Sequence, residues 1–345
     1  MTTAIAAKTQ PRRDAERAHV QGALDRLTAL VAADLEAVNT TITGYMQSDV
    51  PMIPQLAGYL IEAGGKRIRP MLTLAAARMC GHAGDGHVKL ATAVEFIHTA
   101  SLLHDDVVDN SSLRRGKAAA NIIFGNQASV LVGDYLFSRS FRLMVETGSL
   151  ATLDILANAA AIITEGEVLQ LTAAKNIATS DETYMKVIAA KTAALFAAAA
   201  EVGGVIANRP VREAQALHAY GRELGIAFQL VDDALDYGSV HAKFGKSVGD
   251  DFREGKVTLP VILAHAAGDH AERAFWSRVI ADGVQKDGDL EEAIRILSRH
   301  GAVARTLERA HAHADAAKDA LAIFAPSPLR DALSDVADFC VDRAY

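Results

Sequence analysis

Apolar residues recur three and four positions apart along most of the chain, and strict alternation of apolar and polar residues is nearly absent. This spacing places apolar side chains on one face of an α-helix, whereas alternation is typical of strands. A clear example lies within a helix expected over residues 18–46, whose apolar stripe consists of Leu24, Leu27, Leu30, Val31 and Leu35. The pattern therefore predicts an all-α protein.

Prolines, glycines and polar clusters divide the rest of the chain into further helices. They are expected over residues 56–61, 70–79, 88–105, 126–144, 150–174, 183–207 and 211–236, and several amphipathic helices follow from 261 to 345. Residues 1–15 carry no such pattern and are expected to form a disordered lead. Because no long linker interrupts the remainder, residues 16–345 are expected to form one domain.

Two of these helices end in the same arrangement of carboxylates, Asp-Asp-x-x-Asp. Its two copies are Asp105, Asp106 and Asp109, and then Asp232, Asp233 and Asp236. Residues four apart on a helix share a face, so their charges repel one another unless a cation compensates. Mg²⁺ prefers hard oxygen ligands and shares its remaining positions with phosphates. One copy alone could be a solvated helix end, but the pair predicts two facing clusters that hold Mg²⁺ ions on one polyphosphate.

Basic residues accompany both carboxylate motifs. The segment Gly64-Gly65-Lys66-Arg67-Ile68-Arg69-Pro70 fits either a basic helix–helix turn or a cradle for a diphosphate, because Arg can grip phosphate with two hydrogen bonds. The glycine-rich segment 244–260 is interpreted as a flap that brings Lys246 and Lys256 to the phosphates. It is not a P-loop, because position 240 is Val and no strand precedes it.

Composition excludes several classes of protein. Half of the 345 residues are hydrophobic and the net charge is −7, without a basic patch, so nucleic-acid binding is not expected. Cys80 and Cys340 are interpreted as buried apolar residues in a reducing cytoplasm. The chain starts without an apolar signal segment, and the stretch 192–207 is interrupted by Glu201 and too short to span a membrane. The sequence leaves a transient contact with a membrane as an open alternative.

A second kind of metal site also has to be considered. Glu95-x-x-His98 and Glu308-x-x-His311 both match the Glu-x-x-His spacing of di-iron sites in helical bundles. The second pair lies in a segment dense in charge, 305–319, which is better interpreted as a solvated helix face. His98 also lies seven residues before Asp105 on the same helix face, which favours a role beside the aspartates.

Taken in order, these motifs resemble those of the trans-isoprenyl diphosphate synthases, the polyprenyl synthetase family. The resemblance rests on Gly-Gly-Lys-Arg-x-Arg-Pro, Leu-x-His-Asp-Asp-x-x-Asp with Arg-Arg-Gly, Gly-Asp-Tyr-Leu, Lys-Thr, Phe-Gln-x-x-Asp-Asp-x-x-Asp and Gly-Lys-x-x-Gly-x-Asp, between Gly64 and Pro260. It implies a single bundle of mostly antiparallel helices around a deep central cavity, usually as a homodimer, and a prenyltransferase activity.

The resemblance also implies roles for individual residues. The six aspartates would hold Mg²⁺, and Asp105, Asp106, Asp109, Asp232, Asp233 and Lys191 would be catalytic. The allylic diphosphate would be bound by Arg114, Lys191, Thr192, Gln229, Lys246 and Lys256. Isopentenyl diphosphate would be bound by Lys66, Arg69, His98 and Arg115. The ring of Phe228 would face the carbocation, or else pack in the core.

Product length depends, in this family, on the residues below the first motif. Ala100 and Ser101, and Ala93 further back, are small and leave room for a long tail, although Ile97 could still form a floor. A product of about eight to ten isoprene units, as in quinone side chains, is expected from the resemblance. The alternatives are a short-chain farnesyl or geranylgeranyl diphosphate synthase, a non-catalytic subunit of a heteromeric synthase and, less well supported, a terpene cyclase.

Overall fold

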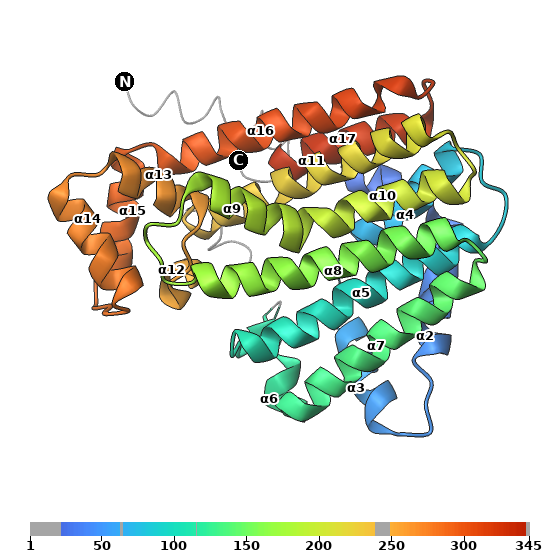
Figure 1. Ribbon diagram of the computed structural model, residues 1–345, viewed down its shortest axis with the longest axis horizontal. Coiled ribbons are helices and arrows are strands. Elements are labelled where there is room, and N and C mark those ends of the chain that lie inside the picture. Colours follow the sequence, from blue (N-terminus) through green and yellow to red (C-terminus); the bar gives the residue numbers. More distant parts are fainter. Residues whose placement is uncertain (1–21, 63–64, 115, 239–248, 343–345) are drawn as a thin grey trace, which may run out of the picture.

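The computed structural model describes residues 22–62, 65–114, 116–238 and 249–342, and these are almost entirely helical (Figure 1). Residues 22–30 are helical, and α2 (Ala32–Tyr45), α3 (Met52–Glu62), α4 (Ile68–Met79), α5 (Gly86–Val108), α6 (Ala120–Phe124), α7 (Asn126–Glu146) and α8 (Leu150–Ala173) follow. Between α5 and α6, strands β1 (Leu113–Arg114) and β2 (Lys117–Ala118) form a small antiparallel hairpin.

The second half begins with α9 (Asp181–Ile188), a π-helical turn (Ala189–Ala193) and α10 (Ala194–Ile206), which continue one another. The remaining elements are α11 (Val211–Asp236), α12 (Asp250–Glu254), α13 (Leu259–Ala267), α14 (His270–Trp276), a π-helical turn (Ser277–Ala281), α15 (Asp289–Arg299), α16 (Ala302–Ala320), a 3₁₀ turn (Leu321–Ile323) and α17 (Pro328–Asp342). The prediction of an all-α fold is confirmed.

The long helices run side by side along the molecule (Figure 1). Helix α10 packs on α4, α5, α8 and α11, α5 also packs on α7, and α11 also packs on α16. Short connections after α7, α10 and α16 make consecutive helices antiparallel. Helices α13–α15 gather at one end of the bundle. One continuous apolar core extends from Ala23 to Val341. That residues 16–345 form one domain stays a prediction, and the expected disordered lead, 1–15, lies outside the described residues.

Small residues on α10 allow its neighbours to approach closely. A Cβ atom added to Gly203 would lie 2.7 Å from the Cβ of Ala76 and 2.8 Å from the backbone N of Ala77, both on α4. A Cβ added to Gly221 on α11 would collide with the backbone carbonyl of Phe196 on α10. Backbone therefore comes close to backbone on two sides of α10, and this sets the spacing of α10 from α4 and from α11.

One described helical stretch, Asp181–Ile206, is long and apolar enough to span a membrane, with a mean hydropathy of 1.4. The apolar stretch expected from the sequence began later, at residue 192, and was too short to span a membrane. In the structure, 72% of the most apolar 18-residue part of this stretch is buried inside the bundle, as expected of a helix with neighbours on several sides. The apolar side chains of α9 and α10 therefore pack mainly in the core.

Candidate active site

The first carboxylate motif closes α5, and its aspartates point in different directions. Asp105 Oδ2 lies 3.7 Å from Lys191 Nζ, and Asp109 Oδ2 lies 3.9 Å from Lys256 Nζ. Asp106 is instead only 2% exposed and accepts hydrogen bonds from Nε and Nη2 of Arg114, at 2.9 and 2.5 Å. Asp106 therefore fastens the β1–β2 hairpin to α5, while Asp105 and Asp109 face the second motif.

The second motif, at the end of α11, shows the same division. Asp233 is 4% exposed and accepts hydrogen bonds from Tyr184 Oη at 2.5 Å and Gln229 Nε2 at 2.7 Å. Burial raises the pKa of Asp233 to about 7. Asp236 accepts the backbone N–H groups of Asp250 and Asp251, at 3.2 and 3.1 Å, and so caps α12. Asp232 is half-buried.

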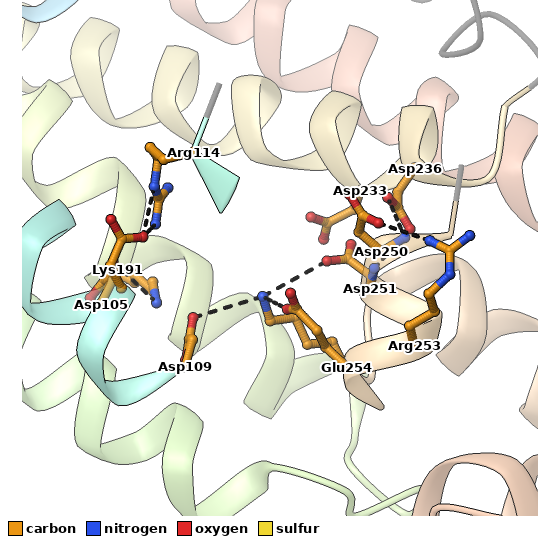
Figure 2. A network of polar contacts seen from close by, with 12 residues as sticks. Asp105, Asp109, Arg114, Lys191, Asp233, Asp236, Asp250, Asp251, Arg253 and Glu254 are labelled. Carbon is orange, nitrogen blue, oxygen red and sulfur yellow. Dashed lines mark hydrogen bonds and ion pairs between the residues drawn. The ribbon is translucent and has the colours of Figure 1, made fainter. Parts of the chain in front are cut away.

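Lys256 lies between the two motifs. Its Nζ is 3.9 Å from Asp109 Oδ2, 4.0 Å from Asp251 Oδ1 and 2.5 Å from Glu254 Oε2. Burial lowers the pKa of Lys256, but the carboxylates of Asp251 and Glu254 outweigh it and raise that pKa above its usual range. Figure 2 shows Asp105 and Asp109 on one side, and Asp233, Asp236 and Asp251 on the other. The expectation that the two motifs face each other is thus met.

Lys191 and Thr192 lie side by side in the π-helical turn, a feature often found at functional sites. Lys191 Nζ donates to Glu167 Oε2 on α8 at 2.7 Å, and Thr192 Oγ1 donates to Gln229 Oε1 at 2.8 Å. Burial, followed by the charge of Asp105, raises the pKa of the Glu167 carboxyl. Burial also raises the pKa of Asp105, although Lys191 opposes it. These carboxylates are crowded and favour a bound cation.

One of the basic residues before the first motif, Arg69, lies next to His98. Arg69 Nη1 lies 3.1 Å from His98 Nε2, and its guanidinium lies 4.3 Å from the ring centroid of Phe196. The exposed Lys66 has its Nζ 4.9 Å from the ring centroid of Phe339 on α17. The structure thus brings Arg69 and His98 together, as the cradle hypothesis requires.

Arg67 and Glu95 settle the di-iron alternative. Arg67, the cation between Lys66 and Arg69, forms an ion pair with Glu95 and occupies its carboxylate. Glu308 lies exposed on α16, as expected of a solvated helix face. The two Glu-x-x-His pairs therefore do not form a shared metal site, and the di-iron alternative is wrong.

Arg115 and Lys246 lie outside the described residues. The ring of Phe228 is 5.5 Å from that of Phe196, so one side of it packs against an aromatic neighbour. Sequence reasoning assigned no role to Glu167, Tyr184 or Asp251. A carboxylate on an otherwise apolar helix was the available signal for Glu167, and the Gly-x-Asp motif was the signal for Asp251.

The donor chemistry fits Mg²⁺. The candidate metal ligands on both sides of the site are carboxylates, which are hard oxygen donors. No three His, Cys, Asp or Glu side chains within the described part of the chain form a ready-made metal site. Mg²⁺ usually takes one or two carboxylates from a protein and completes its coordination with substrate phosphates and water. The residues present therefore suit a metal shared with a diphosphate.

Two facing carboxylate motifs with cations between them, carried on a helical bundle, are the arrangement expected of proteins that bind a diphosphate through divalent metal. The profile of the polyprenyl synthetase family matches residues 50–297. The octaprenyl diphosphate synthase of Escherichia coli (strain K12) is 45% identical over 320 residues, covering 93% of this chain and 99% of the relative. The chain belongs to the polyprenyl synthetase family, a family of prenyltransferases.

Two crystal structures are similar over most of the chain. A decaprenyl diphosphate synthase from Rhodobacter capsulatus has a TM-score of 0.91 and 57% identity, covering 93% of this chain and 99% of that one. A polyprenyl synthase from Caulobacter crescentus CB15, complexed with calcium and isoprenyl diphosphate, has a TM-score of 0.90 and 53% identity, covering 93% and 98%. Both confirm the expected family and its all-α bundle.

Proposed function

We propose that this chain is a cytoplasmic, long-chain all-trans-polyprenyl diphosphate synthase with products of about C40–C50 that serve as quinone side chains. It condenses isopentenyl diphosphate onto an allylic diphosphate. The observation that carries the proposal is the pair of carboxylate motifs that face each other with Lys191 and Lys256 beside them. Similarity to octaprenyl and decaprenyl diphosphate synthases supports the product class.

The allylic diphosphate binds between the motifs. Negative charge grows on it as the allylic C–O bond breaks, and fixed cations lower the barrier for this step. The proposed binding residues are Arg114, Lys191, Thr192, Gln229, Lys246 and Lys256. Asp106 holds Arg114 in place, and Glu167 holds Lys191. Bound Mg²⁺ ions, with Asp105, Asp109 and Asp232 as their proposed protein ligands, would neutralise further charge on the leaving group.

Asp106, Asp233 and Asp236 have a positioning role in this proposal. Each already accepts two hydrogen bonds, from Arg114, from Tyr184 and Gln229, and from the start of α12. A carboxylate with two such donors has fewer lone pairs left for a metal. The motifs therefore combine cation ligands with residues that hold the surrounding elements.

The second substrate binds at the other basic cluster. Lys66, Arg69, His98 and Arg115 hold the diphosphate of isopentenyl diphosphate, and the 3.1 Å contact between Arg69 and His98 supports this grouping. The double bond of this substrate attacks the allylic carbocation and forms the new C–C bond. A proton is then lost to the departing diphosphate, so the step requires no side-chain base.

A product assay tests the proposal. The purified chain is incubated with Mg²⁺, labelled isopentenyl diphosphate and farnesyl diphosphate, and the dephosphorylated products are sized by chromatography. Products of about C40–C50 are expected. Products that stop near C20 would instead support the short-chain alternative. A complete lack of product with both substrates present would support the non-catalytic-subunit alternative.

The small side chain of Ala100 is proposed to leave room for a long product. Ala100 is 1% exposed, and Ile97 and Ala93 lie buried on the same helix, in the core below Asp105. Ala100→Phe places an aromatic ring in the path of the growing chain, so the main product is expected to shorten to about C20 or less. Ser101→Ala adds no volume and serves as the control. An unchanged product length in Ala100→Phe would contradict this placement of the tail.

We also propose that the chain forms a homodimer through α7 and α8. These helices carry apolar side chains that are more than half exposed, namely Leu131, Val145, Leu150, Val168 and Leu171. Between the helices lies an open apolar pocket of about 740 Å³, lined in part by Phe137 and Phe141. Monomeric proteins rarely expose large contiguous apolar patches, and a symmetric dimer is the commonest way to cover one.

A further inference from the structure

A chain of hydrogen bonds starts at a residue that the proposed reaction does not use. Tyr184 on α9 is buried, and its hydroxyl donates to Asp233 Oδ2 at 2.5 Å. The other oxygen of Asp233 accepts from Gln229 Nε2 at 2.7 Å. Gln229 Oε1 in turn accepts from Thr192 Oγ1 at 2.8 Å. Tyr184 is therefore two hydrogen bonds away from a proposed diphosphate ligand and three away from another.

This chain fixes the orientation of the Gln229 amide. With its oxygen toward Thr192 and one N–H toward Asp233, the amide keeps its second N–H for another acceptor. An amide that turned over would place N–H against the Thr192 hydroxyl and oxygen against the Asp233 carboxylate, which repels it. Asp233 therefore determines which groups of Gln229 and Thr192 are presented to a diphosphate.

Asp233 needs a second donor to hold this position. A buried carboxylate is costly unless its oxygens are hydrogen-bonded. Gln229 satisfies one oxygen, and Tyr184 satisfies the other from a separate helix. The phenol also ties α9 to α11 just before the π-helical turn, in which Lys191 reaches Glu167 and Asp105. Without the hydroxyl, the Asp233 side chain could rotate, and the π-helical turn would be held less firmly.

We propose that Tyr184 is a positioning residue for the allylic diphosphate subsite, acting through Asp233 on Gln229 and Thr192. This inference rests on the proposed function, because it assigns those two residues to the diphosphate. Tyr184 touches neither substrate nor metal. Its hydroxyl sets the geometry of the groups that do, and the isopentenyl diphosphate subsite at Arg69 and His98 lies outside the hydrogen-bond chain.

The test compares two buried tyrosines. Tyr184→Phe removes only the hydroxyl that reaches Asp233. Tyr220→Phe is the matched control, because Tyr220 is fully buried and its hydroxyl donates to the backbone oxygen of Leu333 at 2.8 Å, away from the motifs. Binding of inorganic pyrophosphate in the presence of Mg²⁺ is measured by calorimetry, and KM is measured separately for the allylic substrate and for isopentenyl diphosphate.

Tyr184→Phe is expected to weaken pyrophosphate binding and raise the allylic KM about tenfold, with an unchanged KM for isopentenyl diphosphate. Tyr220→Phe is expected to leave all three values unchanged. Equal values for the two variants would overturn the inference. Because pyrophosphate binding needs no turnover, this outcome is distinct from failure of the proposed function, in which the unaltered chain yields no polyprenyl product.

A double variant tests the route of the effect. If Tyr184 acts through Asp233, then Asp233→Asn and Tyr184→Phe disrupt the same hydrogen-bond chain. The double variant then binds pyrophosphate with about the same affinity as the single variant that binds it less tightly. Losses that multiply would show that Tyr184 acts independently of Asp233 and would contradict the proposed route.

Discussion

Neighbouring aspartates within each motif have different surroundings, although the sequence makes them look equivalent. Asp106 and Asp233 are buried and accept two hydrogen bonds each, whereas Asp105 and Asp109 face cations across the site. A helix turns by about 100° per residue, so adjacent positions point to different sides. One side of each motif therefore holds the scaffold, and the other faces the proposed diphosphate site.

Lys256 leads to a prediction about metal removal. The Lys256→Met variant loses the cation between Asp109 and Asp251, whose mutual repulsion is then uncompensated without metal. The melting temperature in EDTA is expected to fall by about 2–4 °C relative to the unaltered chain. Mg²⁺ with pyrophosphate should restore most of this loss. Lys186→Met, which removes an exposed i,i+4 pair with Glu182, is the control. Equal losses in EDTA and in Mg²⁺ would contradict the compensating role.

At the scale of elements, the contact between α4 and α10 predicts a large effect for one methyl group. Gly203→Ala places a Cβ atom 2.7–2.9 Å from atoms of α4, including backbone that cannot move aside easily. The free energy of unfolding is expected to fall by about 1–3 kcal/mol. Gly58→Ala, in α3 with nothing within 4 Å, should leave stability unchanged or slightly raised. Urea denaturation of both variants measures the difference, and a loss at Gly58 as large as at Gly203 would rule out the packing explanation.

Helix α15 begins at Asp289, whose charge should make the stability of the fold depend on pH. Asp289 accepts two hydrogen bonds from Arg278 and one from the backbone of Lys286, and the Arg278 contact lowers the pKa of Asp289 to about 2. Because its pKa is lower in the folded state than in the unfolded one, Asp289 stabilises the fold above about pH 4, and this stabilisation is lost as the pH falls toward 2.

The measurement is the difference in unfolding free energy between the unaltered chain and Asp289→Asn. It should be about 1 kcal/mol at pH 7, because the pair is partly exposed to solvent, and it should shrink as the pH falls below about 4. A difference that stays constant from pH 7 to pH 3 would show that the charge is not the cause.

For the whole molecule, the apolar surface of α7 and α8 predicts the assembly. Val168→Lys places a charge on the proposed dimer surface and should convert the dimer to a monomer at micromolar concentration. Val211→Lys, at the start of α11, is the control, since Val211 is also well exposed. Analytical ultracentrifugation distinguishes the two states. A monomeric unaltered chain, or a Val168→Lys variant that stays dimeric, would exclude this surface.

The sequence predicted the helices, because they depend on the local spacing of apolar residues. It also named carboxylates and cations that the structure brings close together, such as Asp109 and Lys256. It did not predict the π-helical turn at Lys191 and Thr192, for which a single helix over 183–207 was expected. Nor did it predict Glu167 or Tyr184 as partners of site residues. These contacts join residues far apart in the chain, such as Tyr184 and Asp233, and no periodicity encodes such a pairing.

The membrane-length helix at Asp181–Ile206 has a consequence for synthesis of the chain. A segment of this length and hydropathy could be recognised for insertion into a bilayer as it leaves the ribosome. Helices α4, α5 and α8, against which α10 packs, are translated before it, and α11 follows after a short turn. The order of elements along the chain thus provides an apolar surface for this segment as soon as it emerges, and favours folding over insertion.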